Sequence, residues 1–158
     1  MEIRSVAVIG AGTMGAGIAQ VCAQAGWQTR LFDAFPEGLE AGMDRIDSFW
    51  DKGIARGKTT SEQKAEWQAN LTAVNDMAEA VSDVDLVIEA VPEIMELKQQ
   101  IFADLGRFSP AHAILGTNTS GLSIGDIANA SGRPEQVIGM HFFNPVPIMK
   151  LLELVRHD

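Results

Sequence analysis

Short apolar runs alternate with amphipathic stretches along most of this sequence. The runs are rich in β-branched and aliphatic residues, which is typical of strands buried in a sheet. They cover residues 3–9, 29–32, 71–74, 85–90, 113–117, 136–140 and 151–155. The amphipathic stretches predict helices at residues 14–25, 93–107 and 123–130, and Ser123 with Asp126 suggests a capping box. Strands that alternate with helices predict an α/β fold built on a doubly wound, mostly parallel sheet.

Residues 38–70 break this alternation. The segment is helical in pattern and rich in charge, and residues 53–61 interrupt it. We expect two helices that form an excursion after the second strand of the sheet. All of 1–158 is expected to form one domain, because 158 residues suffice for a single hydrophobic core.

The composition restricts the class of partner. A net charge of −9 argues against nucleic acid, because neutralising phosphates needs clustered Lys and Arg. No apolar run approaches the ~20 residues that a membrane span needs, and the first residues lead straight into a strand pattern without a signal sequence. With Cys22 as the only cysteine, no disulfide can form within the chain, and a reducing cytoplasm is the expected compartment.

A glycine motif, Gly10-x-Gly12-x-x-Gly15, follows the first strand and opens the first helix. The first glycine permits a tight turn, the second lets a pyrophosphate approach the backbone, and the third lets helix and strand pack closely. The helix N-terminus then offers free N–H groups and a positive dipole end to the phosphates. Asp33 ends the second strand, where its carboxylate would accept hydrogen bonds from the adenosine ribose. This context predicts a Rossmann-type dinucleotide site.

The same motif favours NAD among the dinucleotides. Asp33 would repel a 2′-phosphate, and residues 34–36 contain no Arg that could bind one, so NADP is disfavoured. FAD is a weaker possibility because nothing in the sequence marks a flavin-specific site. The alternative to all three is a glycine-rich turn that binds no ligand.

Candidate catalytic groups follow two predicted strands and lie within a third. His141 lies just beyond the strand 136–140, at the sheet edge where such folds bind ligands. Its imidazole could take the hydroxyl proton of an alcohol while hydride leaves to nicotinamide, and a purely structural histidine is the alternative. Glu153 interrupts the apolar strand 151–155, where a neighbouring imidazole would satisfy a buried carboxylate. The alternative places Glu153 on the solvated face of an edge strand.

The polar segment Asn118-Thr119-Ser120 also follows a predicted strand. Its amide and hydroxyl groups could hold a substrate alcohol or the nicotinamide. A polar turn that caps a helix is the alternative on local grounds.

Together these residues resemble a known family. The segment 118–120, the run 141–151 (HFFNPVPIMKL) and Glu153 are similar to the 3-hydroxyacyl-CoA dehydrogenases, notably the bacterial 3-hydroxybutyryl-CoA and 3-hydroxyadipyl-CoA types. The similarity spans essentially the whole chain. The resemblance implies an NAD-dependent enzyme that oxidises an L-3-hydroxyacyl-CoA to the 3-ketoacyl-CoA, with an acyl-CoA as substrate and no metal ion.

The resemblance also implies roles for individual residues. His141 would be the general base, Glu153 its partner, and Ser120 a hydrogen-bonding group for the substrate oxygen. The implied cofactor-binding set comprises Gly10, Gly12, Thr13, Met14, Gly15, Asp33, Glu93, Lys98, Asn118, Ser120 and Asn144. Residues 38–70 resemble the helical arm that lies over CoA, where Lys52, Arg56 and Lys58 could meet its phosphates. The alternative for these three cations is an ordinary solvated helix surface.

Two departures from the family pattern affect these expectations. Gly121 stands where a second serine is usual, which we expect to loosen the loop that carries Ser120. The second, all-helical domain of the family, which supplies most of the dimer contact and part of the acyl pocket, is expected to be absent. The chain would then be one domain of a longer enzyme, with a homodimer expected for the full-length parent.

Two other functions stay open. A related dehydrogenase could act on a small free hydroxy acid, although such a substrate needs no long arm. The chain could also be a non-catalytic module that binds NAD or a partner. For the isolated domain of an enzyme, we expect NAD binding with poor turnover, because the acyl pocket and dimer contacts are incomplete.

Overall fold

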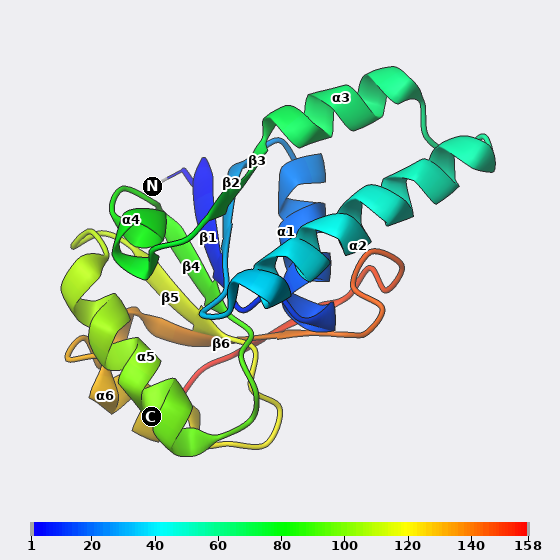
Figure 1. The fold of residues 1–158 in the computed structure, drawn as a ribbon. Coiled ribbons are helices and arrows are strands. Elements are labelled where there is room, and N and C mark those ends of the chain that lie inside the picture. The colour runs from blue at the N-terminus through cyan, green and yellow to red at the C-terminus, as the bar shows by residue number, and fades with distance from the viewer. Residues whose placement is uncertain (1, 158) are drawn as a thin grey trace.

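A seven-stranded sheet forms the centre of the molecule, and helices cover both of its faces (Figure 1). The structure, a computed structural model, describes residues 2–157. The strands are β1 (Ser5–Ile9), β2 (Gln28–Phe32), β3 (Leu71–Val74), β4 (Leu86–Glu89), β5 (Ile114–Thr117), β6 (Val137–Phe142) and β7 (Leu152–Val155). They lie in the order β3-β2-β1-β4-β5-β6-β7, and only β7 runs antiparallel to its neighbour. The predicted doubly wound, mostly parallel sheet is therefore confirmed.

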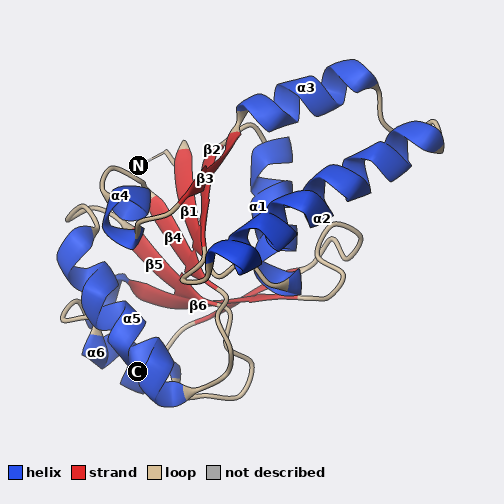
Figure 2. Ribbon diagram, viewed as in Figure 1, coloured by secondary structure: helices blue, strands red, loops and turns tan. Residues whose placement is uncertain are grey.

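Six α-helices connect these strands within the described residues, as Figure 2 shows in blue. They are α1 (Thr13–Gln24), α2 (Pro36–Ala55), α3 (Ser61–Ala69), α4 (Met77–Val81), α5 (Met95–Phe108) and α6 (Ile124–Ala130), and a 3₁₀ turn covers Pro134–Gln136. The side chain of Ser123 accepts a hydrogen bond from the Asp126 N–H, so this part of the predicted cap of α6 is confirmed. The short helix α4 was not predicted, although the Asp76 side chain caps it in the same way by accepting from the Glu79 N–H.

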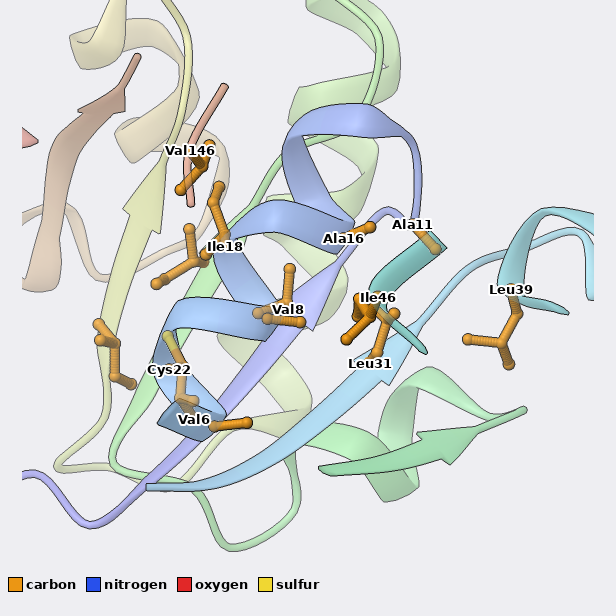
Figure 3. Close-up of a cluster of buried hydrophobic side chains, with 14 of the residues drawn as sticks. Val6, Val8, Ala11, Ala16, Ile18, Cys22, Leu31, Leu39, Ile46 and Val146 are labelled. Carbon is orange, nitrogen blue, oxygen red and sulfur yellow. The ribbon is translucent and has the colours of Figure 1, made fainter. Parts of the chain in front are cut away.

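Two hydrophobic clusters, one on each face, hold the helices to the sheet. The pleat sends alternate residues of β1 to opposite faces, so Val6 and Val8 enter one cluster while Ala7 and Ile9 enter the other. The first cluster contains the apolar sides of α1 and α2, and Figure 3 shows Val6 and Val8 among these side chains. The second is formed with α4, α5 and α6. Because strands buried on both faces read as continuous apolar runs, the sequence pattern located most of this core.

The excursion after β2 consists of α2 and α3, which pair as an arm that extends away from the sheet (Figures 1 and 2). At its base the Trp50 indole N–H donates to the Gln24 side chain at 2.9 Å, and the Trp50 and Trp67 rings lie 5.7 Å apart. Further out, the Lys64 ammonium lies 2.8 Å from the Asp47 carboxylate and also pairs with a second acid of α2. The tryptophan pair and the ion pairs of Lys64 join α2 to α3, so the arm is an ordered unit rather than a loop.

Strand β7 differs from its prediction. The sequence reads residues 151–155 as a core strand, but Leu151 is 55% exposed and Leu154 is 60% exposed. The physical reason is position, since β7 lies at the edge of the sheet and pairs only with β6. An apolar run does not distinguish a central strand from an edge strand. Within residues 2–157, no helix is long and apolar enough to cross a membrane.

Candidate active site

A cavity of about 920 Å³ opens where the carboxyl ends of the parallel strands meet. Strands β1 and β4 are neighbours there. From β1 the chain continues to β2 and β3 on one side, and from β4 it continues to β5 and β6 on the other. Doubly wound sheets bind ligands where the strand order reverses in this way. The lining residues are Ile9, Gly10, Gly12, Thr13, Met14, Phe32, Asp33, Ala34, Phe35, Met77, Ala90, Val91, Pro92, Glu93, Leu97, Ile101, Asn118, Ser120, His141, Phe142, Phe143 and Asn144. Most of the residues expected from sequence to form the site therefore share one cavity.

The glycine turn between β1 and α1 is shaped by close backbone contacts. Gly10 has a φ of 107°, and a Cβ there would lie 2.6 Å from the Ala90 carbonyl oxygen. A Cβ at Gly15 would lie 1.7 Å from the Gly10 carbonyl oxygen, so helix and turn touch directly. At Gly12, by contrast, a Cβ would meet no described atom within 4 Å, because this position faces the cavity. Gly15 does not line the cavity, and its contribution is the packing beneath it.

The start of α1 is suited to an anion. The first helical hydrogen bond runs from the Ala16 N–H to the Gly12 carbonyl at 2.8 Å. Helix geometry leaves the preceding N–H groups, among them those of Thr13 and Met14, without a partner in the helix. No described side chain caps this helix start, and its first turn contains no acidic residue. These N–H groups and the helix dipole can therefore serve a phosphate.

Asp33 follows β2, and two main-chain groups hold its carboxylate. Its Oδ2 accepts from the Ala11 N–H at 2.8 Å, and its Oδ1 accepts from the Phe35 N–H at 2.9 Å. A Cβ at Gly38 would lie 3.0 Å from the same Oδ1, so the absence of a side chain there leaves room for this orientation. The carboxylate lines the cavity, where its remaining lone pairs can accept hydrogen bonds from ribose hydroxyls.

A buried ion pair that sequence reasoning missed lies behind the cavity wall. Glu89 is 0% exposed and Lys98 is 1% exposed, and the Lys98 Nζ lies 2.6 Å from the Glu89 Oε2. The same ammonium lies 3.0 Å from the Oε1 of Glu93, which does line the cavity. A contact of Lys98 with NAD was predicted. In this structure Glu93 lies between Lys98 and the cavity, so Lys98 would act on NAD by holding Glu93. The available signal was a carboxylate inside an apolar strand, because such a group needs a partner when buried.

The Glu93 carboxylate is held in its charged form. Burial alone would raise its pKa, but hydrogen bonds from Lys98 and Thr119 outweigh burial and hold the pKa of Glu93 below its ordinary value. At neutral pH this end of the cavity therefore presents a hydrogen-bond acceptor.

The segment after β5 presents two of its three polar side chains to the cavity. Asn118 and Ser120 line it, whereas Thr119 is buried and bonds within the protein. The Thr119 hydroxyl donates to Glu93 Oε2 at 2.8 Å and accepts from the Leu122 N–H at 3.1 Å. Thr119 therefore stabilises the turn, but it does not cap a helix, because the N-cap of α6 is Ser123. A binding role stays a prediction for Asn118 and Ser120.

His141 and Glu153 face each other across the β6–β7 ladder. The His141 Nδ1 and the Glu153 Oε1 lie 3.9 Å apart, which allows an ionic contact but is longer than a hydrogen bond. Of the two positions that the sequence left open for Glu153, the structure has the exposed one, since the side chain is 60% exposed on the edge strand. His141 is less exposed, at 27%, and its ring packs against Phe143 with ring centroids 4.6 Å apart.

The loop after β6 is fixed by packing on α1. Val146 is 5% exposed and enters the same cluster as Ile18, beside which it lies in Figure 3. Its neighbour Asn144 lines the main cavity and also a second hollow of about 110 Å³ between α1, α2 and this loop. Arg45 and Phe49 of α2 line this hollow, and the sequence analysis singled out neither.

The three cations predicted to meet CoA lie apart from these hollows. Lys52 belongs to the last turn of α2, and Arg56 and Lys58 lie in the connection to α3. This connection forms the far end of the arm (Figure 1). All three are exposed, and none lines either hollow. Their predicted role and the solvated alternative both stay open.

A phosphate-binding turn and an imidazole that border one cavity define a Rossmann-type dinucleotide-binding domain of the dehydrogenase class. Comparison with known families makes this more specific. Residues 5–158 match the model described as 3-hydroxyacyl-CoA dehydrogenase, NAD binding domain. The chain therefore belongs to the 3-hydroxyacyl-CoA dehydrogenase family, and NAD is its cofactor.

Individual relatives agree with this assignment. The chain is 44% identical over 99% of its length to a probable 3-hydroxybutyryl-CoA dehydrogenase of Bacillus subtilis, of which it covers 54%. It is 44% identical over 98% of its length to the 3-hydroxyadipyl-CoA dehydrogenase of Escherichia coli, of which it covers 32%. A crystal structure of M. tuberculosis FadB2 superposes with a TM-score of 0.95 at 41% identity, covering 99% of this chain and 55% of that one. The chain thus spans about half the length, or less, of these relatives.

Proposed function

We propose that this chain is the NAD-binding half of an enzyme that oxidises an L-3-hydroxyacyl-CoA to the 3-ketoacyl-CoA. The observation that carries the proposal is the position of His141. Its ring borders the same cavity as the glycine turn, and Glu153 lies opposite on the neighbouring strand. The names of the relatives, 3-hydroxybutyryl-CoA and 3-hydroxyadipyl-CoA dehydrogenase, support a CoA thioester as substrate.

The proposed chemistry moves one proton and one hydride from the substrate. Bound NAD would supply the acceptor for the hydride on the carbon that bears the hydroxyl group. The His141 Nδ1 faces Glu153, so its Nε2 is the nitrogen proposed to take the hydroxyl proton. The imidazolium that forms would be stabilised by the Glu153 carboxylate across the strand pair. Ser120 and Asn144 border the same cavity and would orient the substrate oxygen and the nicotinamide.

The arm is proposed to hold the CoA part of the substrate. Thr13 and Asn144 line both the main cavity and the hollow at the arm's base, so a thioester in the cavity could continue along α2. Arg45 is the cation in this hollow and a candidate for the CoA phosphates. Lys52, Arg56 and Lys58 would meet those phosphates only if CoA extends to the far end of the arm.

Further parts of the proposal concern the whole enzyme. A second, helical domain would complete the acyl pocket, which agrees with relatives that are about twice as long or longer. The homodimer proposed for the whole enzyme follows from the family resemblance alone. A reducing cytoplasm is the proposed compartment, since the only cysteine is buried and unpaired.

The test is NADH oxidation with acetoacetyl-CoA by the polypeptide that carries residues 1–158. NADPH and free acetoacetate are the matched controls. Turnover that needs both NADH and the thioester supports the proposal. Equal turnover of free acetoacetate would instead support the dehydrogenase of a free hydroxy acid. NADH binding without turnover, even with the helical domain present, would leave only the non-catalytic module.

A further inference from the structure

Three consecutive residues at the end of β5 are tied to two glutamates. The Thr117 hydroxyl donates to Glu89 Oε1 at 2.6 Å. The Asn118 N–H donates to the Glu89 carbonyl at 2.9 Å, and the Thr119 hydroxyl donates to Glu93 Oε2 at 2.8 Å. The segment that enters the cavity is therefore anchored at each residue before Ser120.

Lys98 joins the two glutamates into one unit. Its ammonium contacts Glu89 at 2.6 Å and Glu93 at 3.0 Å, and it also donates to the Val91 carbonyl at 3.2 Å. The Val91 N–H in turn donates to Glu89 Oε2 at 2.7 Å. Because Glu89 and Lys98 are almost completely buried, the removal of Lys98 would leave the Glu89 charge without its ionic partner. This energetic cost restricts Glu89, Lys98 and Glu93 to a small range of relative positions.

The anchored segment reaches the candidate base. The Asn118 Oδ1 accepts from the Phe142 N–H at 2.9 Å, and Phe142 directly follows His141. On the other side, a Cβ at Gly121 would meet no described atom within 4 Å, so its packing does not hold the loop. The Thr119 hydroxyl instead bonds both Glu93 and the Leu122 N–H, and the Gly121 backbone also hydrogen-bonds Glu93.

From this connectivity we infer that Glu89, Lys98, Thr117 and Thr119 are positioning residues of the reaction. They hold Asn118 and Ser120 at a fixed distance from His141, and none of the four lines the cavity. The inference rests on the proposed function, because positioning has meaning only where His141 and Ser120 act on one substrate. The inference assigns a catalytic consequence to four buried side chains that do not line the cavity.

The central test uses isosteric changes in the same polypeptide. Thr119→Val removes the hydroxyl and keeps the shape, and we expect kcat with acetoacetyl-CoA to fall about tenfold to a hundredfold, the usual effect of a misplaced catalytic group. The dissociation constant for NADH should stay within about twofold. Thr119→Ser should restore most of kcat. The matched control is Thr29→Val, which removes a buried hydroxyl that bonds only its own strand entry, at the Trp27 carbonyl.

A double-mutant cycle separates positioning from general stability. If Thr119 acts through Ser120, then Thr119→Val should cost little further kcat in the Ser120→Ala background. Additive losses, or an unchanged kcat in Thr119→Val alone, would overturn the inference. Should Thr119→Val fail to fold, Thr117→Val cuts the anchor to Glu89, and the same loss of kcat is expected.

Amide hydrogen exchange tests the inference without turnover. We expect Thr119→Val to speed exchange of the Phe142 N–H, which reaches the network only through Asn118, by at least about tenfold. The Val8 N–H in β1 should not change. If exchange at Phe142 is unaffected, the inference fails even in an active enzyme. If exchange responds but no 3-ketoacyl-CoA is reduced, the network stands and the proposed function fails.

Discussion

A single methyl group at either of two glycines of the phosphate turn should have opposite consequences. In Gly15→Ala the new Cβ would start 1.7 Å from the Gly10 carbonyl oxygen, whereas real Cβ atoms keep about 3.0 Å. Helix α1 or the turn must therefore shift by about 1.3 Å, the difference between these two distances. In Gly12→Ala the methyl group meets no described atom within 4 Å and lies where the pyrophosphate is expected.

Two energies compete in Gly15→Ala. Overpacking of a rigid backbone contact costs about 3 kcal/mol, the upper end of the usual range, because neither atom belongs to a flexible side chain. Alanine gains about 1 kcal/mol over glycine as a helix former. The clash is the larger effect, so the free energy of unfolding should fall by about 2 kcal/mol. In Gly12→Ala no such clash exists, so the free energy of unfolding should stay within about 0.5 kcal/mol.

Urea denaturation and NADH titration measure the two effects separately. Gly15→Ala should lower the urea midpoint and weaken NADH binding because the turn has moved. Gly12→Ala should keep the urea midpoint and weaken NADH binding by tenfold or more. The reasoning is refuted if Gly15→Ala is as stable as the parent chain, or if Gly12→Ala binds NADH equally well.

Three further predictions concern titratable and reactive groups. His141→Gln should abolish turnover while the NADH dissociation constant stays near that of the parent, with His112→Gln at the opposite end of the sheet as control, and lost NADH binding would make His141 structural. Since the pKa of Glu93 is held low, its charge stabilises the fold above the unfolded pKa of about 4.5, and this contribution is lost as pH falls. The free energy of unfolding should therefore fall less steeply between about pH 5 and 3 in Glu93→Gln than in the parent chain. If the two pH dependences are parallel, the lowered pKa of Glu93 does not contribute to stability. Burial raises the pKa of Cys22 to about 12, so a thiol reagent at pH 8 should modify it only on unfolding, and rapid modification of the native chain would show that the core opens.

The parts of this protein that sequence predicted well are those in which one local pattern has one structural meaning. The apolar runs of β1 and β4 and the strand–glycine–helix motif each determine a local shape and a buried face. The carboxyl ends of parallel strands also meet at one edge, so the gathering of Asp33, Asn118 and His141 around one cavity was predictable.

The parts that sequence did not predict depend on where an element lies in the assembled sheet. The run around Leu152 and Leu154 contains too few polar residues to be recognised as an edge strand. Their exposure follows only from the position of β7 at the end of the strand order. Lys98 looks like a surface cation of an amphipathic helix, but the buried carboxylate of Glu89 draws it inward. The hollow beside Arg45 is formed by three elements distant in sequence, and no local pattern describes it.

The pairing of β7 with β6 bears on turnover but not on the affinity for NAD. Glu153 owes its position opposite His141 to the register of this ladder, and a slip by one residue would turn its side chain to the other face. The turn that receives the phosphates lies between β1 and α1 and does not depend on β7. Local opening of an exposed edge strand costs less free energy than global unfolding. Fraying at this edge would therefore stop the proposed proton transfer while the domain continues to hold its dinucleotide.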